Sequence, residues 1–74
     1  MEKLLDILND IRPDLDFSKE EKLIDDGILD SFDIITIITE LNDGFDISIN
    51  VNDILPENLN SAQNMWKLVE RLKK

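Results

Sequence analysis

The stretch DSFDIITIITELNDGFD, residues 30–46, decides the fold class of this chain. Asp30 and Ser31 are both suited to begin a helix, because a short side-chain oxygen accepts a hydrogen bond from an unpaired backbone N–H. A run of β-branched residues follows and favours a strand. The apolar period that continues beyond that run favours a helix; its members are Ile34, Ile37, Ile38, Leu41 and Phe45. We therefore predict a helix over 31–43, ended by a left-handed Gly44.

Two more main helices and one short helix are predicted outside this stretch. Residues 2–12 and 61–72 carry apolar side chains at helical spacing. Asn60, with a glutamine three residues on, resembles a capping box for the last helix. Trp66 and Met65 lie on the inner face of that helix and are expected in the core. A single helical turn is expected over 52–55, broken at Pro56.

The connecting segments complete the predicted fold. The segment from Pro13 to Asp30 has no sustained period, so we expect a long first loop that scattered apolar residues pin to the helices. Residues 47–51 alternate like a strand, but one short strand without a partner is not stable, so we predict an extended connector whose apolar residues enter the core. The chain is therefore predicted to be all-α, a single four-helix domain over residues 1–74.

Composition excludes several classes of function. The chain has 17 acidic and 8 basic residues and a net charge of -9, which disfavours nucleic acid and anionic membranes and favours partners with basic surfaces. It has no histidine and no cysteine, which excludes Ser-His and Cys-His nucleophiles and His/Cys zinc sites. No apolar run is long enough to span a bilayer, and the N-terminus has no signal-peptide pattern. We expect a cytoplasmic protein that does not insert into membranes.

Ser31 is the candidate functional residue. The start of a helix presents unpaired N–H groups and the positive end of the helix dipole, both of which suit a phosphate. The same position also suits a serine that merely caps the helix. Local physics alone leaves both interpretations open.

The residues around Ser31 resemble a known family. The run Asp26-Gly27-Ile28-Leu29-Asp30-Ser31-Phe32, with Phe45 fourteen residues after the serine, resembles the phosphopantetheine attachment region of acyl carrier and peptidyl carrier proteins. The resemblance covers the whole chain, including a last helix begun by a small polar pair, here Asn60-Ser61. It implies the four-helix carrier fold, with a 4′-phosphopantetheine arm on Ser31 that holds an acyl or aminoacyl thioester.

The resemblance also implies partners. They are a phosphopantetheinyl transferase, an adenylating ligase or other acyl-loading enzyme, and a downstream acyl-accepting enzyme, served by a monomeric carrier that is not itself an enzyme. Positions around Ser31 are expected to contact these enzymes; we assign Asp30, Phe32, Asp33, Ile35 and Thr39 to that role. Phe32 has an alternative role as a lid over the first loop. The predicted second helix carries fewer acids than in fatty-acid carriers and looks closer to D-alanyl and stand-alone peptidyl carriers, which indicates aminoacyl cargo.

Two alternatives are weighed against this interpretation. An acidic helical adaptor would bind a basic protein and never use Ser31. Calcium binding of the EF-hand type fails, because neither glycine stands in a loop with the required ligand positions. Loose divalent binding at Asp25, Asp26 and Asp30 would be charge neutralisation, and no specific metal site is predicted.

Overall fold

The helices of this chain begin and end at residues that satisfy their terminal backbone groups. The computed structural model describes residues 1–73, which form four α-helices, one 3-10 helix and no strand. The α-helices are α1 Glu2–Ile11, α2 Ser31–Phe45, α3 Pro56–Leu59 and α4 Ala62–Leu72, and the 3-10 helix η1 is Val51–Asp53. The all-α prediction is confirmed. The first and last helices match their predicted ranges to within one residue at each end.

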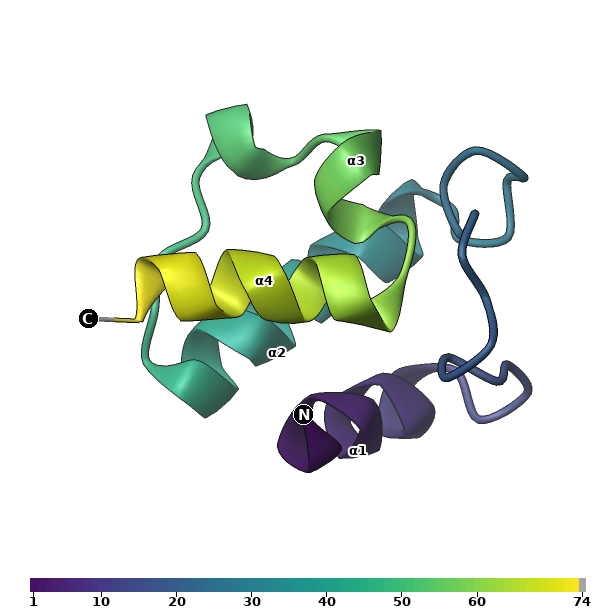
Figure 1. The fold of residues 1–74 in the computed structure, drawn as a ribbon, viewed down its shortest axis with the longest axis horizontal. Coiled ribbons are helices and arrows are strands. Elements are labelled where there is room, and N and C mark those ends of the chain that lie inside the picture. The colour runs from purple at the N-terminus through teal and green to yellow at the C-terminus, as the bar shows by residue number, and fades with distance from the viewer. Residues whose placement is uncertain (74) are drawn as a thin grey trace.

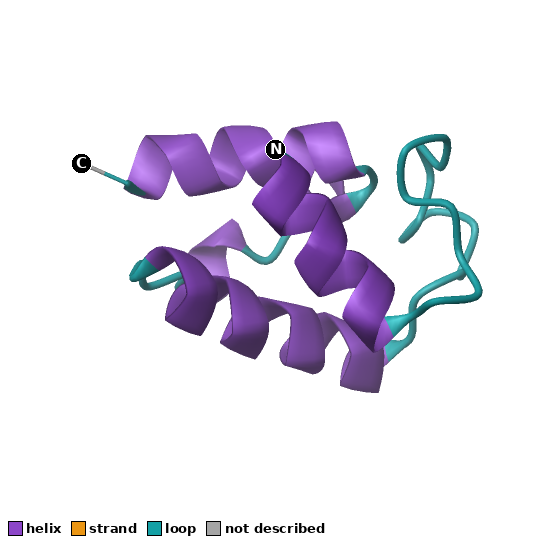
Figure 2. Ribbon diagram, turned by 90° about the horizontal axis from the view of Figure 1, so that it is seen from below, coloured by secondary structure: helices purple, strands orange, loops and turns teal. Residues whose placement is uncertain are grey.

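The helices pack around a single hydrophobic core. α1 packs mainly against α2 and also touches α4, while the short α3 packs on α4. In Figure 1, α4 crosses the middle of the molecule, with α2 behind it and α1 below. Figure 2 shows α1 running obliquely across the gap between the other two long helices, with the first loop gathered at one end. The radius of gyration, 10.9 Å, is close to the value of about 11 Å expected for a compact domain of this length.

Each long helix supplies fully buried side chains to the core. Leu4 and Leu8 come from α1, Ile37 and Leu41 from α2, and the last helix adds Ala62, Met65, Leu68 and Val69. The predicted inner face of α4 omitted Leu68, which is 1% exposed. Trp66, predicted to be core, is only half-buried and stands edge-on to Phe45 with ring centroids 5.8 Å apart.

The first loop is long, as predicted, and residues 12–30 contain no helix. Phe17, Leu23 and Leu29 enter the core from it. The Asn60 side chain fixes its middle, accepting hydrogen bonds from the Ile24 and Asp25 backbone N–H groups at 3.0 Å each. This loop is therefore tied to the helices before it reaches α2.

The predicted end of the second helix is wrong. α2 continues through Gly44 to Phe45, and the left-handed residue is Asp46, at φ 54° and ψ 50°. A Cβ on Gly44 would lie 2.9 Å from Ile7 Cδ1, so the missing side chain lets α1 approach α2 closely. Gly44 serves helix packing instead of ending the helix.

Two predictions for the second half of the chain are also wrong. The helical turn expected over 52–55 is replaced by η1 and by α3, which Pro56 begins instead of breaks, because a proline at the first helical position loses no hydrogen bond. The last helix is capped by Ser61, whose Oγ accepts from the Asn64 N–H at 3.1 Å, and not by Asn60.

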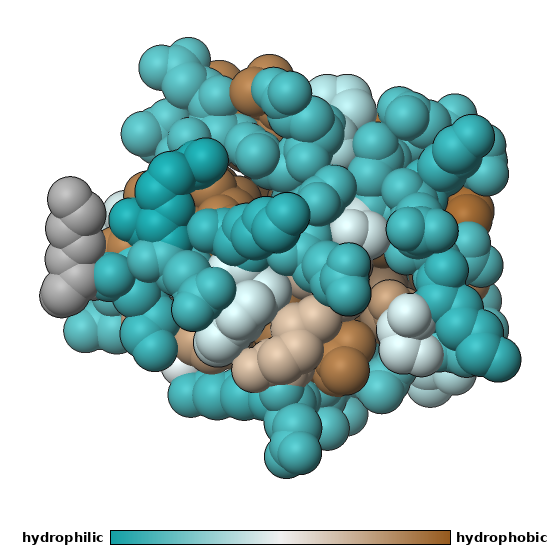
Figure 3. All heavy atoms as spheres, in the orientation of Figure 1, coloured by the Kyte–Doolittle hydropathy of each residue, from teal (hydrophilic) through white to brown (hydrophobic). Residues whose placement is uncertain are grey.

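The connector predicted over residues 47–51 is present over residues 47–50, and Val51 begins η1 instead. Ile47 and Ile49 are each 8% exposed and enter the core, whereas Val51 is 82% exposed. On the face drawn in Figure 3, hydrophilic residues cover most of the surface and hydrophobic atoms show in small areas between them. Within residues 1–73, no helix combines the length and the apolar character needed to cross a bilayer.

Candidate functional site

The start of α2 is closed by a reciprocal cap. The Asp30 side chain accepts a hydrogen bond from the Asp33 N–H at 2.9 Å, and Asp33 Oδ2 accepts in turn from the Asp30 N–H at 3.4 Å. Asp30 is extended, at φ -96° and ψ -178°, so it is the N-cap and Ser31 is the first helical residue. The sequence offered both residues as the cap, and the structure selects Asp30. Ser31 is thereby released from a capping role.

Ser31 differs from the other three serines of the chain in its exposure and in the role of its hydroxyl. Ser61 is 9% exposed and caps α4 through its oxygen. The Ser18 hydroxyl donates to Asp16 Oδ1 within a tight turn, and Ser48 lies in the extended connector. Ser31 is exposed, and within residues 1–73 no hydrogen bond engages its hydroxyl. Of the two serines at helix starts, Ser61 uses its side-chain oxygen to cap a helix and Ser31 does not.

The backbone around Ser31 leaves donors for a bound phosphate. The Asp33 N–H is taken by Asp30, and the Ile34 N–H donates to the Asp30 carbonyl at 3.0 Å. The N–H groups of Ser31 and Phe32 have no partner in the described part of the chain. A phosphodiester on Ser31 therefore fits this site through two N–H donors, fewer than an uncapped helix start would offer.

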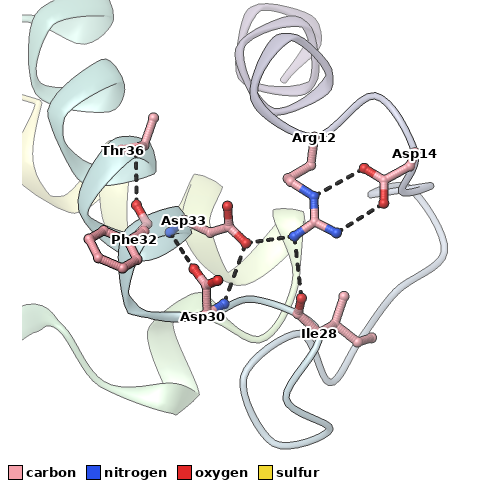
Figure 4. Close-up of polar contacts among 7 residues, drawn as sticks. All are labelled: Arg12, Asp14, Ile28, Asp30, Phe32, Asp33 and Thr36. Atoms are coloured by element: carbon pink, nitrogen blue, oxygen red, sulfur yellow. Dashed lines mark hydrogen bonds and ion pairs between the residues drawn. The ribbon is translucent and has the colours of Figure 1, made fainter.

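An arginine at the end of α1 holds the first turn of α2. Arg12 Nη1 donates to Asp33 Oδ2 at 2.6 Å, and its Nε and Nη2 donate to the two oxygens of Asp14 at 3.0 and 2.9 Å. Figure 4 shows the guanidinium between these two carboxylates, with Ile28 O beneath it at 3.5 Å. Hydrogen bonds from Arg12 lower the pKa of Asp14, and hydrogen bonds to Asp14 and Asp33 raise the pKa of Arg12.

An apolar face lies beside Ser31. Phe32 is 80% exposed and Ile35 is 63% exposed, and the Phe32 ring points away from Arg12 in Figure 4. The hydroxyls of Thr36 and Thr39 donate to the carbonyls of Phe32 and Ile35 at 2.9 Å each. These bonds occupy both hydroxyl protons, so the threonines present their methyl groups and oxygen lone pairs on this surface.

The residues predicted to contact partners lie at the N-cap and in the first three turns of α2, but they differ in accessibility. Asp30, Phe32, Ile35 and Thr39 are exposed. The Asp33 side chain is 17% exposed and is bound by Arg12. Phe32 does not cover the first loop, since a ring with this exposure packs against little. The alternative role as a lid is therefore wrong.

The net negative charge of the protein comes from the part of the chain that carries this site. Residues 23–66 contain nine acidic residues and no basic one, whereas the rest of the chain has eight of each. The nine are Asp25, Asp26, Asp30, Asp33, Glu40, Asp43, Asp46, Asp53 and Glu57. The whole net charge thus lies in the segment that includes α2, η1 and α3, and any electrostatic attraction of this chain toward a basic surface comes from that segment.

The acids of the first loop do not form a metal cage. Among residues 1–73 no three carboxylates are grouped so that they could hold a metal ion. The Asp25 carboxylate instead accepts from the Asn60 amide at 3.1 Å.

Comparison with known proteins gave no match to a family model, to a curated protein or to a solved structure.

Sequence reasoning missed Arg12 at this site. One signal was present in the sequence: Arg12 is followed by Pro13, which disfavours a helical backbone at Arg12 and so places it just after the end of α1. Its partner Asp33 lies 21 residues away, and no periodicity connects the two.

Proposed function

We propose that this chain is a carrier protein that holds an acyl or aminoacyl group on a 4′-phosphopantetheine arm attached to Ser31. The observation that supports the proposal is an exposed serine at the first position of α2, with its hydroxyl unengaged and the cap supplied by Asp30. The Asp-Ser-Phe sequence at that position and the exposed apolar face next to it fit the same role.

The attachment reaction needs an accessible hydroxyl and a donor of the arm. Ser31 Oγ forms a bond to the phosphorus that carries the pantetheine in coenzyme A, and the pyrophosphate P–O bond of coenzyme A breaks. Adenosine 3′,5′-bisphosphate leaves, and the serine proton passes to a base on the transferase. The arm supplies a thiol, which this chain lacks, as the point of thioester attachment.

The face around Ser31 defines how partners bind. A transferase, a loading ligase and an acyl-accepting enzyme would each place an apolar pocket over Phe32 and Ile35 and basic residues near Asp30. Phe32 contributes an aromatic anchor, a residue type that carries much of the energy of protein interfaces. The nine acids of residues 23–66 increase the rate of encounter with such surfaces.

Aminoacyl cargo is favoured over fatty-acyl cargo. Along α2 three uncharged polar residues, Thr36, Thr39 and Asn42, separate the acids Asp33, Glu40 and Asp43. Among these acids only Glu40 and Asp43 are exposed, since Arg12 binds the Asp33 carboxylate. A loading enzyme that selects a dense row of carboxylates has less to bind here. An adenylating ligase is accordingly the proposed loading partner.

The second candidate is the acidic helical adaptor, and the exposed Phe32, Ile35 and Val51 favour it to the same extent. These side chains would bind an apolar pocket on a basic protein whether or not Ser31 is modified. The two functions differ only in whether Ser31 receives a phosphopantetheine arm.

A mass measurement tests the carrier proposal. The wild-type protein is incubated with coenzyme A, Mg²⁺ and a broad-specificity phosphopantetheinyl transferase, and its intact mass is measured. We expect the gain of one phosphopantetheine on wild type and on Ser48→Ala, a control at another exposed serine, and no gain on Ser31→Ala. An unchanged wild-type mass supports the adaptor and contradicts the carrier.

A further inference from the structure

Arg12 is the basic residue that reaches the first turn of α2, and the proposed function gives it no task. It is the C-cap residue of α1, at the start of the first loop, yet its shortest contact is with Asp33 Oδ2, at 2.6 Å. The side chain is 28% exposed, and its partner 17%. The pair is therefore more shielded than an ordinary surface ion pair, for which screening by water removes most of the attraction.

The guanidinium is oriented before it meets Asp33. Asp14 binds Nε and Nη2 through both of its oxygens, which leaves Nη1 directed at α2 (Figure 4). A two-point contact of this kind fixes the plane of the guanidinium, which a lysine ammonium cannot reproduce. Asp14 is thus part of the support for the contact with Asp33.

The same oxygen of Asp33 completes the cap around Ser31. Asp33 Oδ2 accepts from Arg12 and from the Asp30 N–H, while the Asp33 N–H donates to Asp30. Ser31 lies between the two carboxylates of this reciprocal cap. Without Arg12 these carboxylates would repel each other across one helical turn, and the turn that presents Ser31 would open more often.

We propose that Arg12 is a positioning residue for the reaction at Ser31, acting through Asp33 to keep the first turn of α2 closed. The inference rests on the proposed function. Arg12 does not touch the reacting atoms. Its effect is on the fraction of molecules in which the Ser31 hydroxyl and the Ser31 and Phe32 N–H groups are held in the helical geometry.

If only the net charge of the protein mattered, loss of Arg12 would speed the transfer of the arm and not slow it. Arg12→Gln makes the protein more acidic, and steering by charge would speed its encounter with a basic transferase. Lys22→Gln makes the same change of charge at an exposed loop residue outside the Arg12–Asp33 contact. The two variants therefore separate positioning from charge.

The test measures two quantities for wild type, Arg12→Gln, Arg12→Lys, Asp14→Asn and Lys22→Gln. The first is kcat/KM for phosphopantetheine transfer. We expect a fall of about tenfold for Arg12→Gln, since a small misplacement of a reacting group is costly. The kcat/KM values of Arg12→Lys and Asp14→Asn should lie between those of Arg12→Gln and wild type. The kcat/KM of Lys22→Gln should equal or exceed that of wild type.

The second quantity is the hydrogen-exchange rate of the Asp33 and Ile34 amides, measured by NMR without the transferase. Both amides should exchange faster in Arg12→Gln and as in wild type in Lys22→Gln. Equal transfer and equal exchange in these two variants would overturn the inference. If wild type accepts no arm, the proposed function fails, and the exchange rates still decide whether Arg12 closes this turn. If Arg12→Gln does not fold, Arg12→Lys and Asp14→Asn decide the outcome by the same two measurements.

Discussion

The starts of α2 and α4 use a serine in two different ways. At α4, Ser61 is the cap: it is 9% exposed, and its oxygen accepts from the Asn64 N–H. At α2 an aspartate takes the capping role one residue earlier, and Ser31 is left exposed at the first helical position. The comparison shows that a serine at a helix start is available for chemistry when a neighbour caps the helix in its place.

The first turns that follow these caps also differ in how much of their apolar side chains is exposed. Met65, on the fourth residue of α4, is 0% exposed, whereas Phe32, on the second residue of α2, is 80% exposed. α4 is inserted into the core from its first turn, and α2 presents its first turn to solvent. One helix start is buried in the core, and the other is exposed to solvent.

The largest effect on stability is expected from Met65→Ala. Removal of a fully buried side chain should lower the free energy of unfolding by about 2–5 kcal/mol. Phe32→Ala should change it by less than about 0.5 kcal/mol, because an exposed ring makes few packing contacts. Urea unfolding followed by circular dichroism measures both. A large loss from Phe32→Ala would show that this ring is part of the core and would remove it from the proposed contact face.

A smaller difference is expected between the two serines. Ser61→Ala removes a side-chain cap and should cost about 1 kcal/mol. Ser31→Ala removes no hydrogen bond within residues 1–73 and should leave stability unchanged within about 0.5 kcal/mol. Thermal unfolding of the two variants beside wild type provides the check. Equal losses would contradict the distinction between the two helix starts.

The smallest expected effect is the pH dependence contributed by Asp14, the carboxylate that supports Arg12. The folded-state pKa of Asp14 lies below its ordinary 3.8, chiefly because Arg12 donates to it, so its ionised form favours folding. This contribution is complete above the ordinary pKa and is lost as the pH falls through the folded pKa. The melting temperature of Asp14→Asn should therefore lie below that of wild type at pH 6 and approach it as the pH falls through the lowered pKa of Asp14.

Ser61→Ala is the control for that titration. Its cap contains no ionisable group, so its difference in melting temperature from wild type should remain constant over the same pH range. Because protonation also reduces the self-repulsion of the acidic chain, only differences between variants are compared. A difference for Asp14→Asn that did not change with pH would show that Arg12 gives this carboxylate no stabilising role.

The sequence predicted those parts of the fold that depend on neighbours along the chain. Asp30 and Ser31 indicated where α2 begins, and the apolar period gave its inner face. Its end was misjudged, because Gly44 stands where a helix often stops. A Cβ at position 44 would lie 2.9 Å from Ile7 Cδ1, so this glycine serves the close approach of α1 to α2. That spacing belongs to the packing of α1 on α2, which no local pattern contains.

In the candidate site too, sequence identified the residues that depend on one helix and missed those that depend on long-range contacts. Ser31, Phe32 and Ile35 were identified from sequence, and their exposure follows from the period of a single helix. Arg12 was not identified, because its contact with Asp33 joins residues 21 positions apart through the course of the first loop. Asn60 was taken for a helix cap for the same reason, since its bonds to the N–H groups of Ile24 and Asp25 span more than 30 residues.

The most direct test of the central claim is to locate the modification within the chain. Wild-type protein treated with coenzyme A, Mg²⁺ and the transferase is digested, and tandem mass spectrometry assigns the added phosphopantetheine to a residue. We predict that it is found on Ser31 and on none of Ser18, Ser48 and Ser61. An arm on one of those three serines, or on no residue at all, would contradict the account.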